Sequence, residues 1–161
     1  MNQNSKFEME QSKLKLIIDC SKNSGRISPF VSEQVDALIK LGVRCEYFTI
    51  ENKGWKGYLK SRNFLLNKIR EFNPDLIHAH FGLSGLLANL QTKVPVITTF
   101  HGCDINKLSL RILSYFPLIF SKYCIFVSAN QAAKVPFFKS KSSILPCGNS
   151  GLTRPRCVTW C

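Results

Sequence analysis

Short apolar runs alternate with amphipathic stretches along most of the chain, and this alternation predicts the fold. Six apolar runs are expected to be strands: KLKLIIDC (13–20), VRCEYFTI (43–50), PDLIHAHF (74–81), VPVITTF (94–100), YCIFVS (123–128) and SSILPCG (142–148). Apolar residues at helical spacing predict the intervening helices: 29–41, 54–73, 83–93, 106–121 and 129–138. Strands that alternate with helices form βαβ units, and right-handed crossovers join them into a sheet. The pattern therefore predicts an α/β fold with a Rossmann-like, doubly wound parallel sheet in a single domain.

Two of the helices have recognisable local signals. Ser28 is placed to cap the first helix, with Pro29 at its first position and Gly42 just beyond its end. The stretch 54–73 is predicted to be one basic amphipathic helix, whose apolar side is formed by Leu59, Leu66, Ile69 and Phe72. Its basic residues, with Trp55 and Tyr58 near its start, suit contact with anionic lipid, although a solvated surface explains them equally well.

The periodic pattern covers only part of the chain and so sets the expected boundaries. Residues 1–12 form a polar N-terminal segment, residues 13–148 the domain, and residues 149–161 a basic tail without periodicity. A chain of 161 residues is long enough to bury a core without disulfides or metal.

Charge and cysteine usage narrow the class of protein. Lys and Arg outnumber Asp and Glu by 22 to 10, and no acidic residue follows Asp104. The excess of positive charge favours an anionic partner. Aromatic residues are not interleaved with basic ones as they are in nucleic-acid binders, so no nucleic-acid partner is expected. Seven cysteines without C-x-x-C spacing, and no export signal, predict a cytoplasmic protein. No apolar run is long enough for a transmembrane helix.

All three histidines lie at or near the ends of predicted strands. His78 and His80 are two residues apart, so they share one side of their strand, and His101 follows the next strand along the chain. His78 lies deeper and is expected to be an ordinary hydrogen-bonded residue, whereas the position of His80 suits either a structural or a ligand-lining role. A zinc site from these histidines and Cys103 lacks further ligands at a recognisable spacing, so no metal site is predicted.

The loop NSGRISPF, which follows the first predicted strand, is a second candidate for binding. Gly25 lets the backbone approach a ligand, and the helix that begins after Ser28 presents free N–H groups suited to a phosphate. The loop has neither the G-x-G-x-x-G nor the P-loop pattern, so an ordinary strand-to-helix turn explains it as well.

Five segments, in this order and spacing, carry a family resemblance: GRISPFVSEQVDALIKLG, PDLIHAHFGLSG, PVITTFHGCDIN, FVSANQ and ILPCG. Together they resemble the N-terminal, acceptor-side domain of GT-B glycosyltransferases of family 4, which are retaining enzymes that use nucleotide-diphospho sugars. The resemblance extends from about Leu14 to Gly148. It implies half of a GT-B fold and sugar transfer onto a polysaccharide or lipid-linked acceptor.

The resemblance also implies roles for individual residues. His101 matches the catalytic histidine near the reacting sugar, and Asp104 lies close to it. Gly25, Arg26 and Ser28 match the loop that approaches the donor diphosphate and the acceptor. His80 and Gly82 match the acceptor side. The family implies no metal cofactor, a nucleotide-sugar as donor, and a location in the cytoplasm or at the inner face of the membrane.

The sequence departs from the family pattern at its end. After ILPCG the family continues with Val-Asp, whereas this chain reads Asn149-Ser150, and no Glu-x7-Glu pair of the donor domain occurs in it. We therefore expect a truncation or frameshift product that is inactive by itself. The alternative is a non-catalytic module that binds an acceptor or a partner and acts with a separately encoded donor domain.

Overall fold

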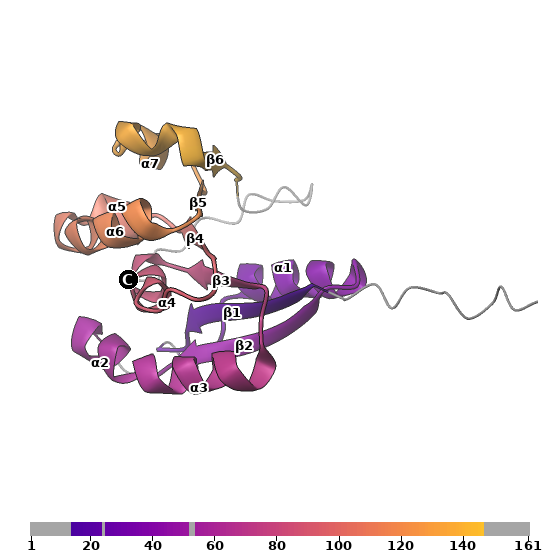
Figure 1. The fold of residues 1–161 in the computed structure, drawn as a ribbon. Helices are drawn as coiled ribbons and strands as arrows, with labels where there is room; N and C mark the ends of the chain where they lie inside the picture. The colour runs from indigo at the N-terminus through magenta and orange to yellow at the C-terminus, as the bar shows by residue number, and fades with distance from the viewer. Residues whose placement is uncertain (1–13, 24, 52–53, 147–161) are drawn as a thin grey trace, which may run out of the picture.

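The strands form one parallel sheet of six in the computed structural model, which describes residues 14–23, 25–51 and 54–146. The sheet order is β2-β1-β3-β4-β5-β6, and every neighbouring pair is parallel (Figure 1). The strands are β1 (Lys15–Ser21), β2 (Arg44–Ile50), β3 (Leu76–His80), β4 (Val96–Phe100), β5 (Tyr123–Phe126) and β6 (Ser142–Ile144). All six predicted strands and the Rossmann-like sheet are confirmed. The predicted N-terminal segment 1–12 and tail 149–161 lie outside the described residues.

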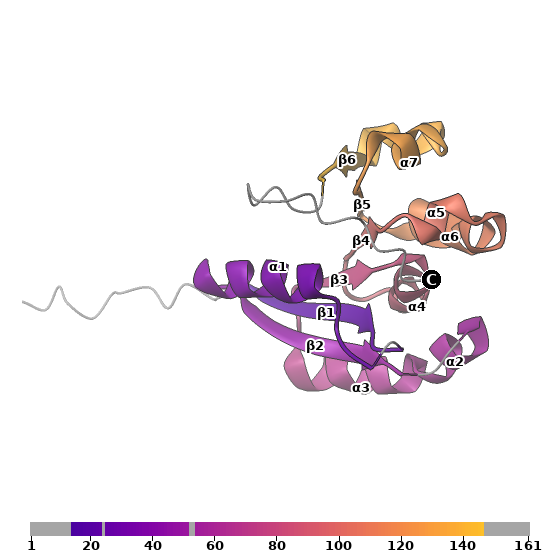
Figure 2. The ribbon, with the colours of Figure 1, turned by 180° about the vertical axis from the view of Figure 1, so that it is seen from behind.

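Helices cover both faces of the sheet. Helix α1 (Pro29–Lys40) lies on one face, and α3 (Arg62–Phe72) lies on the other, as Figures 1 and 2 show from opposite sides. The remaining helices are α2 (Gly54–Lys60), α4 (Gly82–Asn89), α5 (Cys103–Asn106), α6 (Leu108–Phe120), α7 (Ala129–Ala133) and the 3₁₀ helix η2 (Pro136–Lys141). Because helices pack on both faces, the central strands are buried along most of their length, as the apolar runs in the sequence indicated.

The two faces of β3 have different neighbours, and this difference places the histidines. Ile77 and Ala79 lie in the core beneath α2, α3 and α4. His78 and His80 point to the opposite face, because successive side chains of a strand alternate. That face is the one on which α1 packs, through Val31 and Val35, over the apolar side chains of β1.

The predicted helix 54–73 is wrong in one respect, because it is broken into α2 and α3 at Ser61. The buried Ser61 hydroxyl donates to the carbonyl of Gly57 at 3.3 Å, a bond that competes with the regular backbone pattern of the helix. The break changes which side chains face the sheet. Tyr58 and Leu65 are buried there and Leu59 is exposed, whereas the sequence pattern favoured Leu59 and Leu66.

The segment after β4 also differs from the expected loop, since residues 103–106 form the short helix α5. Gly102 precedes it with a φ of 107°. Ser28 does sit at the N-cap of α1 with Pro29 at the first position, as predicted. Its side chain, however, makes no capping hydrogen bond.

Helix α4 packs very closely against β4 and α6 through its glycines. A Cβ at Gly85 would lie 2.7 Å from Thr98 Cγ2 and 2.9 Å from Pro117 Cβ. A Cβ at Gly82 would lie 2.2 Å from Ser114 Oγ. The glycines of the GLSG segment therefore let the helix that follows His80 reach its position against the sheet.

We predict that Gly85→Ala destabilises the protein by about 1–3 kcal/mol, because α4 must move away from both β4 and the rigid ring of Pro117. Denaturant unfolding followed by circular dichroism measures this change. Ser109→Ala, at an exposed position of α6, is the control and should change the free energy of unfolding by less than about 0.5 kcal/mol. Equal stability of Gly85→Ala and wild type would contradict the packing described here.

Candidate functional site

The centre of the sheet contains the point where the chain changes direction. After β1 the chain moves outward to β2, and after β3 it moves the other way through β4 to β6. In open α/β sheets ligands bind at such a point, so we expect a crevice where the loops after β1 and β3 diverge, at the carboxyl ends of these strands. The loop residues 22–23, 25–28, 81–82 and 101–102 follow β1, β3 and β4 at this edge of the sheet.

The three histidines form a column on the α1 face of the sheet at this edge. The Nε2 of His78 lies 2.8 Å from Thr99 Oγ1. The Nδ1 of His80 lies 3.1 Å from His101 Nε2. The ring centroids are 4.3 Å apart for His78 and His80 and 5.4 Å apart for His80 and His101. The hydrogen bond of His78 is the structural role predicted for it.

Two phenylalanines flank the outermost histidine. The ring of Phe30, from the first turn of α1, lies 4.3 Å from that of His101, and the ring of Phe81 lies 4.7 Å from it. His101 is half-buried, whereas His80 is fully buried behind it. The imidazole of His101 is thus held between two aromatic rings just beyond the carboxyl end of β4.

The backbone at Phe81 is strained. Its φ is 78° and its ψ is 150°. Residues other than glycine rarely adopt this backbone conformation, which costs on the order of 1–3 kcal/mol. The strain is held by hydrogen bonds on both sides, from Phe81 N–H to Thr99 O at 2.9 Å and from Gly85 N–H to Phe81 O at 2.9 Å. This conformation turns the chain sharply from β3 into α4 and keeps the Phe81 ring against His101.

Asp104 ties the loops of the site together. Its carboxylate accepts the backbone N–H of His101 at 3.0 Å, and it also accepts from the backbone N–H groups of Gly82 and of Asp104 itself. Burial raises the pKa of this carboxyl above its ordinary value, and the backbone hydrogen bonds partly offset the rise. Asp104 therefore acts on the position of His101 through the backbone.

Burial keeps the histidine column neutral at physiological pH. Burial lowers the pKa of His78 to about 4. It lowers the pKa of His101 to about 3, with a smaller effect from His78. Burial, then His78 and His101, also hold the pKa of His80 well below its ordinary value. Neutral imidazoles can donate and accept hydrogen bonds but offer no fixed positive charge to an anion.

The remaining predicted site residues occupy different settings. Gly25, with a φ of 85°, and Arg26 are exposed in the loop after β1. The Ser28 hydroxyl is buried without a hydrogen-bond partner among the described residues. Gly82 is buried against Ser114, so its observed role is close helix packing beside the site. Among the described residues, no group of three or more His, Cys, Asp or Glu side chains is placed to hold a metal ion.

A buried carboxyl on the other face of the sheet was not singled out from the sequence. Asp19 lies in the middle of β1 and is fully buried, and neither its carboxylate oxygens nor the Ser84 hydroxyl make a well-formed hydrogen bond with the described residues. Burial raises the pKa of Asp19 well above its ordinary value, and the nearby Ser84 hydroxyl offsets this only in part. The signal was available, since IIDC places a charged residue within an apolar strand.

Comparison with known proteins identifies the family. The family model for Glycosyltransferase Family 4 matches residues 27–148, which is more than half of the chain. The chain belongs to Glycosyltransferase Family 4. The match includes Ser28, all three histidines and Asp104. No curated protein matches the sequence.

Solved structures show the same fold as this Glycosyltransferase Family 4 domain. The lipopolysaccharide outer core galactosyltransferase WaaB, in its apo form, has a TM-score of 0.63 and 12% identity over 81% of this chain and 45% of its own. A structure of S. aureus MnaA with UDP has a TM-score of 0.53 and 14% identity, over 82% of this chain and 43% of its own.

A UDP-N-acetylglucosamine 2-epimerase is similar at a TM-score of 0.52 and 8% identity, over 89% of this chain and 53% of its own. The chain thus spans about half the length of the solved structures that it matches. Its single Rossmann-like domain corresponds to one half of a GT-B fold, as the resemblance implied.

The neutral histidines predict a stability that falls in mild acid. Because the pKa of His78 is about 4 in the folded protein and 6.5 in the unfolded chain, the unfolded chain takes up the proton first as the pH falls. His78 alone should cost about 2 kcal/mol of stability at pH 5 relative to pH 8. His78→Asn should lose correspondingly less stability over this range in urea unfolding. Parallel curves for the two proteins would show that His78 is not responsible.

Asp19 predicts an effect of the opposite sign. Since its pKa is raised in the folded protein, its contribution to stability falls as the pH rises above 3.8. Asp19→Asn should therefore be more stable than wild type at pH 8, by about 1–3 kcal/mol, and the difference should shrink towards pH 4. Asp36→Asn, at an exposed position of α1, is the control and should change little. An Asp19→Asn protein that is weaker at every pH would mean that the carboxylate has a favourable partner.

Proposed function

We propose that this chain is the acceptor-side half of a retaining glycosyltransferase, which transfers a sugar from a nucleotide-diphospho sugar to a polysaccharide or lipid-linked acceptor. The observation that carries the proposal is the position of His101. It stands at the mouth of the crevice between β1 and β3, enclosed by Phe30 and Phe81 and hydrogen-bonded to His80. The family match extends across all of these residues.

The residues around the crevice suit complementary roles in such a transfer. His101 and His80, both neutral, offer hydrogen bonds to sugar hydroxyls near the reacting carbon. Arg26 and the N-terminus of α1 supply the positive potential that stabilises a departing diphosphate. The acceptor hydroxyl attacks on the face from which the nucleoside diphosphate leaves, and the reaction needs no metal. Asp104 and Gly82 position the loops beside His101, and their own contact with the substrate stays a prediction.

The proposed activity belongs to a whole protein with two such domains, since this chain spans about half of the structures that it matches. We expect the 161-residue chain alone to bind a donor weakly and to transfer no sugar. We place the enzyme in the cytoplasm or on the inner face of a membrane. The alternative role is a non-catalytic module that binds an acceptor in the same crevice. In that role His101 would take no part in donor binding or sugar transfer.

We predict that His101→Ala lowers kcat of the complete enzyme by about a hundredfold or more, because it removes a group at the reacting centre. Folding should be little affected, since the ring is only half-buried. Release of the nucleoside diphosphate from a nucleotide-sugar measures turnover, and thermal unfolding of the same samples measures stability. Unchanged turnover would show that His101 is not the catalytic histidine.

A binding measurement on the chain as it stands separates the two roles. Nuclear magnetic resonance titration with a nucleoside-diphosphate sugar should shift the backbone signals of Gly25, Arg26 and His101. Arg26→Ala should weaken this binding without loss of fold, because Arg26 is exposed. Lys40→Ala, exposed at the far end of α1, is the matched control. Shifts with an acceptor glycan but none with the donor would favour the non-catalytic module.

A further inference from the structure

Helix α6 carries a row of apolar side chains that points out of the molecule. Leu108, Ile112, Tyr115 and Ile119 recur at intervals of four, three and four residues, so they share one side of the helix. All four are exposed, and so is the neighbouring Phe120. We call these five side chains the α6 surface. An exposed apolar row of this extent is typical of an interaction site.

The α6 surface is distinct from the side of the helix that packs on the fold. Ser114, Pro117 and Leu118 are the buried residues of α6. Leu118 lies in a core cluster with Phe100 and Phe126 of the sheet. The residues of the row are thus not among those through which α6 joins the core.

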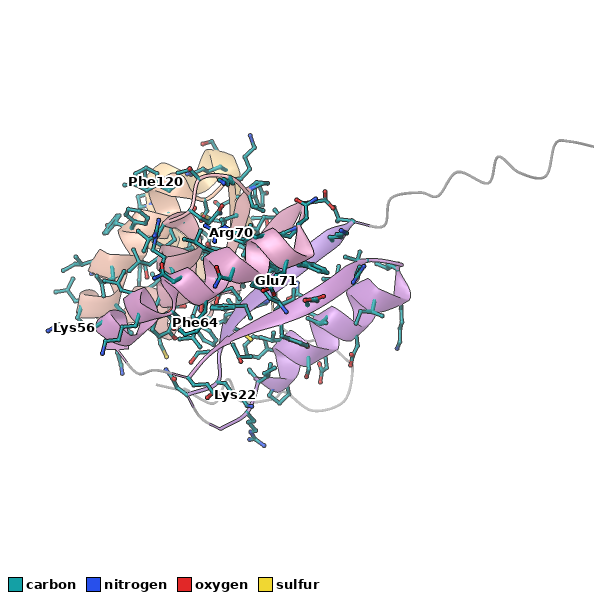
Figure 3. All side chains as sticks on the ribbon, turned by 60° about the horizontal axis from the view of Figure 1, so that its bottom comes forward. Lys22, Lys56, Phe64, Arg70, Glu71 and Phe120 are labelled. Carbon is teal, nitrogen blue, oxygen red and sulfur yellow. The ribbon has the colours of Figure 1, made fainter. Side chains whose placement is uncertain are left out.

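Apolar side chains also project from neighbouring helices of the same layer. Phe64 on α3 is 71% exposed, and Leu59 on α2 is also exposed. Figure 3 shows Phe64 on the outer surface of α3, Lys56 at the end of the neighbouring α2, and Phe120 farther along the molecule on α6. Helix α4 lies between these helices and α6, since it packs against all of them.

The charge around the α6 surface has one sign. Lys107 and Arg111 are one helical turn apart, beside Leu108 and Ile112, and Lys122 follows the end of the helix. No acidic residue occurs in the chain after Asp104. Lys141 adds a further positive charge at the C-terminal end of α6, where its Nζ donates to the carbonyls of Ile119 and Ser121.

We propose that the α6 surface docks on an anionic lipid membrane, with α6 lying parallel to the membrane plane. An apolar row flanked by Lys and Arg matches the chemistry of the lipid interface, where acyl chains lie beneath negatively charged headgroups. Helix α6 has 13 residues, about 20 Å, and none of the described helices is long and apolar enough to cross a membrane. The contact is thus peripheral.

A second copy of the chain fits this surface less well. A symmetric dimer would place the same patch on both sides of the interface, so that Lys107 and Arg111 would approach their own copies with no acidic partner on the patch. Repulsion between these cations would oppose such a contact. The inference depends on the surface alone and does not rest on the proposed transfer reaction.

Co-sedimentation of the full chain with lipid vesicles tests the proposal. The chain should bind vesicles of phosphatidylcholine and phosphatidylglycerol, bind weakly to phosphatidylcholine alone, and dissociate as salt is raised. The pair Ile112→Gln and Ile119→Gln should reduce the affinity by tenfold or more. Lys107→Gln and Arg111→Gln should each reduce it by roughly fivefold on the anionic vesicles only.

Exposed residues on the opposite face of the sheet provide matched controls. Leu41→Gln and Lys40→Gln, at the end of α1, remove the same kinds of side chain and should leave vesicle binding unchanged. Circular dichroism of every variant establishes that the fold is intact. Equal binding to neutral and anionic vesicles, or equal loss in the α1 variants, would overturn the proposal. So would a dimer in sedimentation velocity that Ile112→Gln and Ile119→Gln dissociate, because the α6 surface would then pair two copies.

Discussion

The carboxylate of Asp104 is the interaction on which the geometry of the site depends. It accepts backbone N–H groups from His101, after β4, and from Gly82, after β3, and so joins two loops that are far apart in the chain. Both loops contain a residue with positive φ, Phe81 and Gly102. Glycine adopts this backbone freely, whereas Phe81 is strained in it. The energy of these buried hydrogen bonds offsets the strain and holds His101 beside His80.

The same constraint explains why the glycines of α4 are needed. Helix α4 starts directly after the strained Phe81, so no loop residues are available to adjust its position. It must nevertheless pack against both β4 and α6. Gly82 and Gly85 permit this approach. A Cβ at Gly82 would lie less than 3 Å from Ser114, and a Cβ at Gly85 would lie less than 3 Å from Thr98 and Pro117. The predicted binding role of Gly82 remains a prediction, while its packing role follows from the contacts.

The sequence predicted the sheet well because the central strands are buried on both faces and so read as mainly apolar runs. It failed at Ser61, whose buried hydroxyl donates to the carbonyl of Gly57, because helical periodicity does not indicate that this serine is buried. For the site, alternation placed His78 and His80 on one side. Their contact with His101 needed the register of β3 and β4, in which His80 lies opposite Thr99. Neither that register nor the positive φ of Phe81 has a sequence signal.

The neutrality of the histidines bears on how such a site can hold an anion. Burial lowers the pKa of His101 to about 3, so the imidazole cannot supply charge to an empty crevice. In the proposed reaction, the positive potential would come from Arg26 and from the N–H groups of α1. A diphosphate that enters would favour the protonated imidazole, because a nearby negative charge raises the pKa of a histidine. Donor binding would then draw a proton onto the column at the place where the proposed reaction develops negative charge.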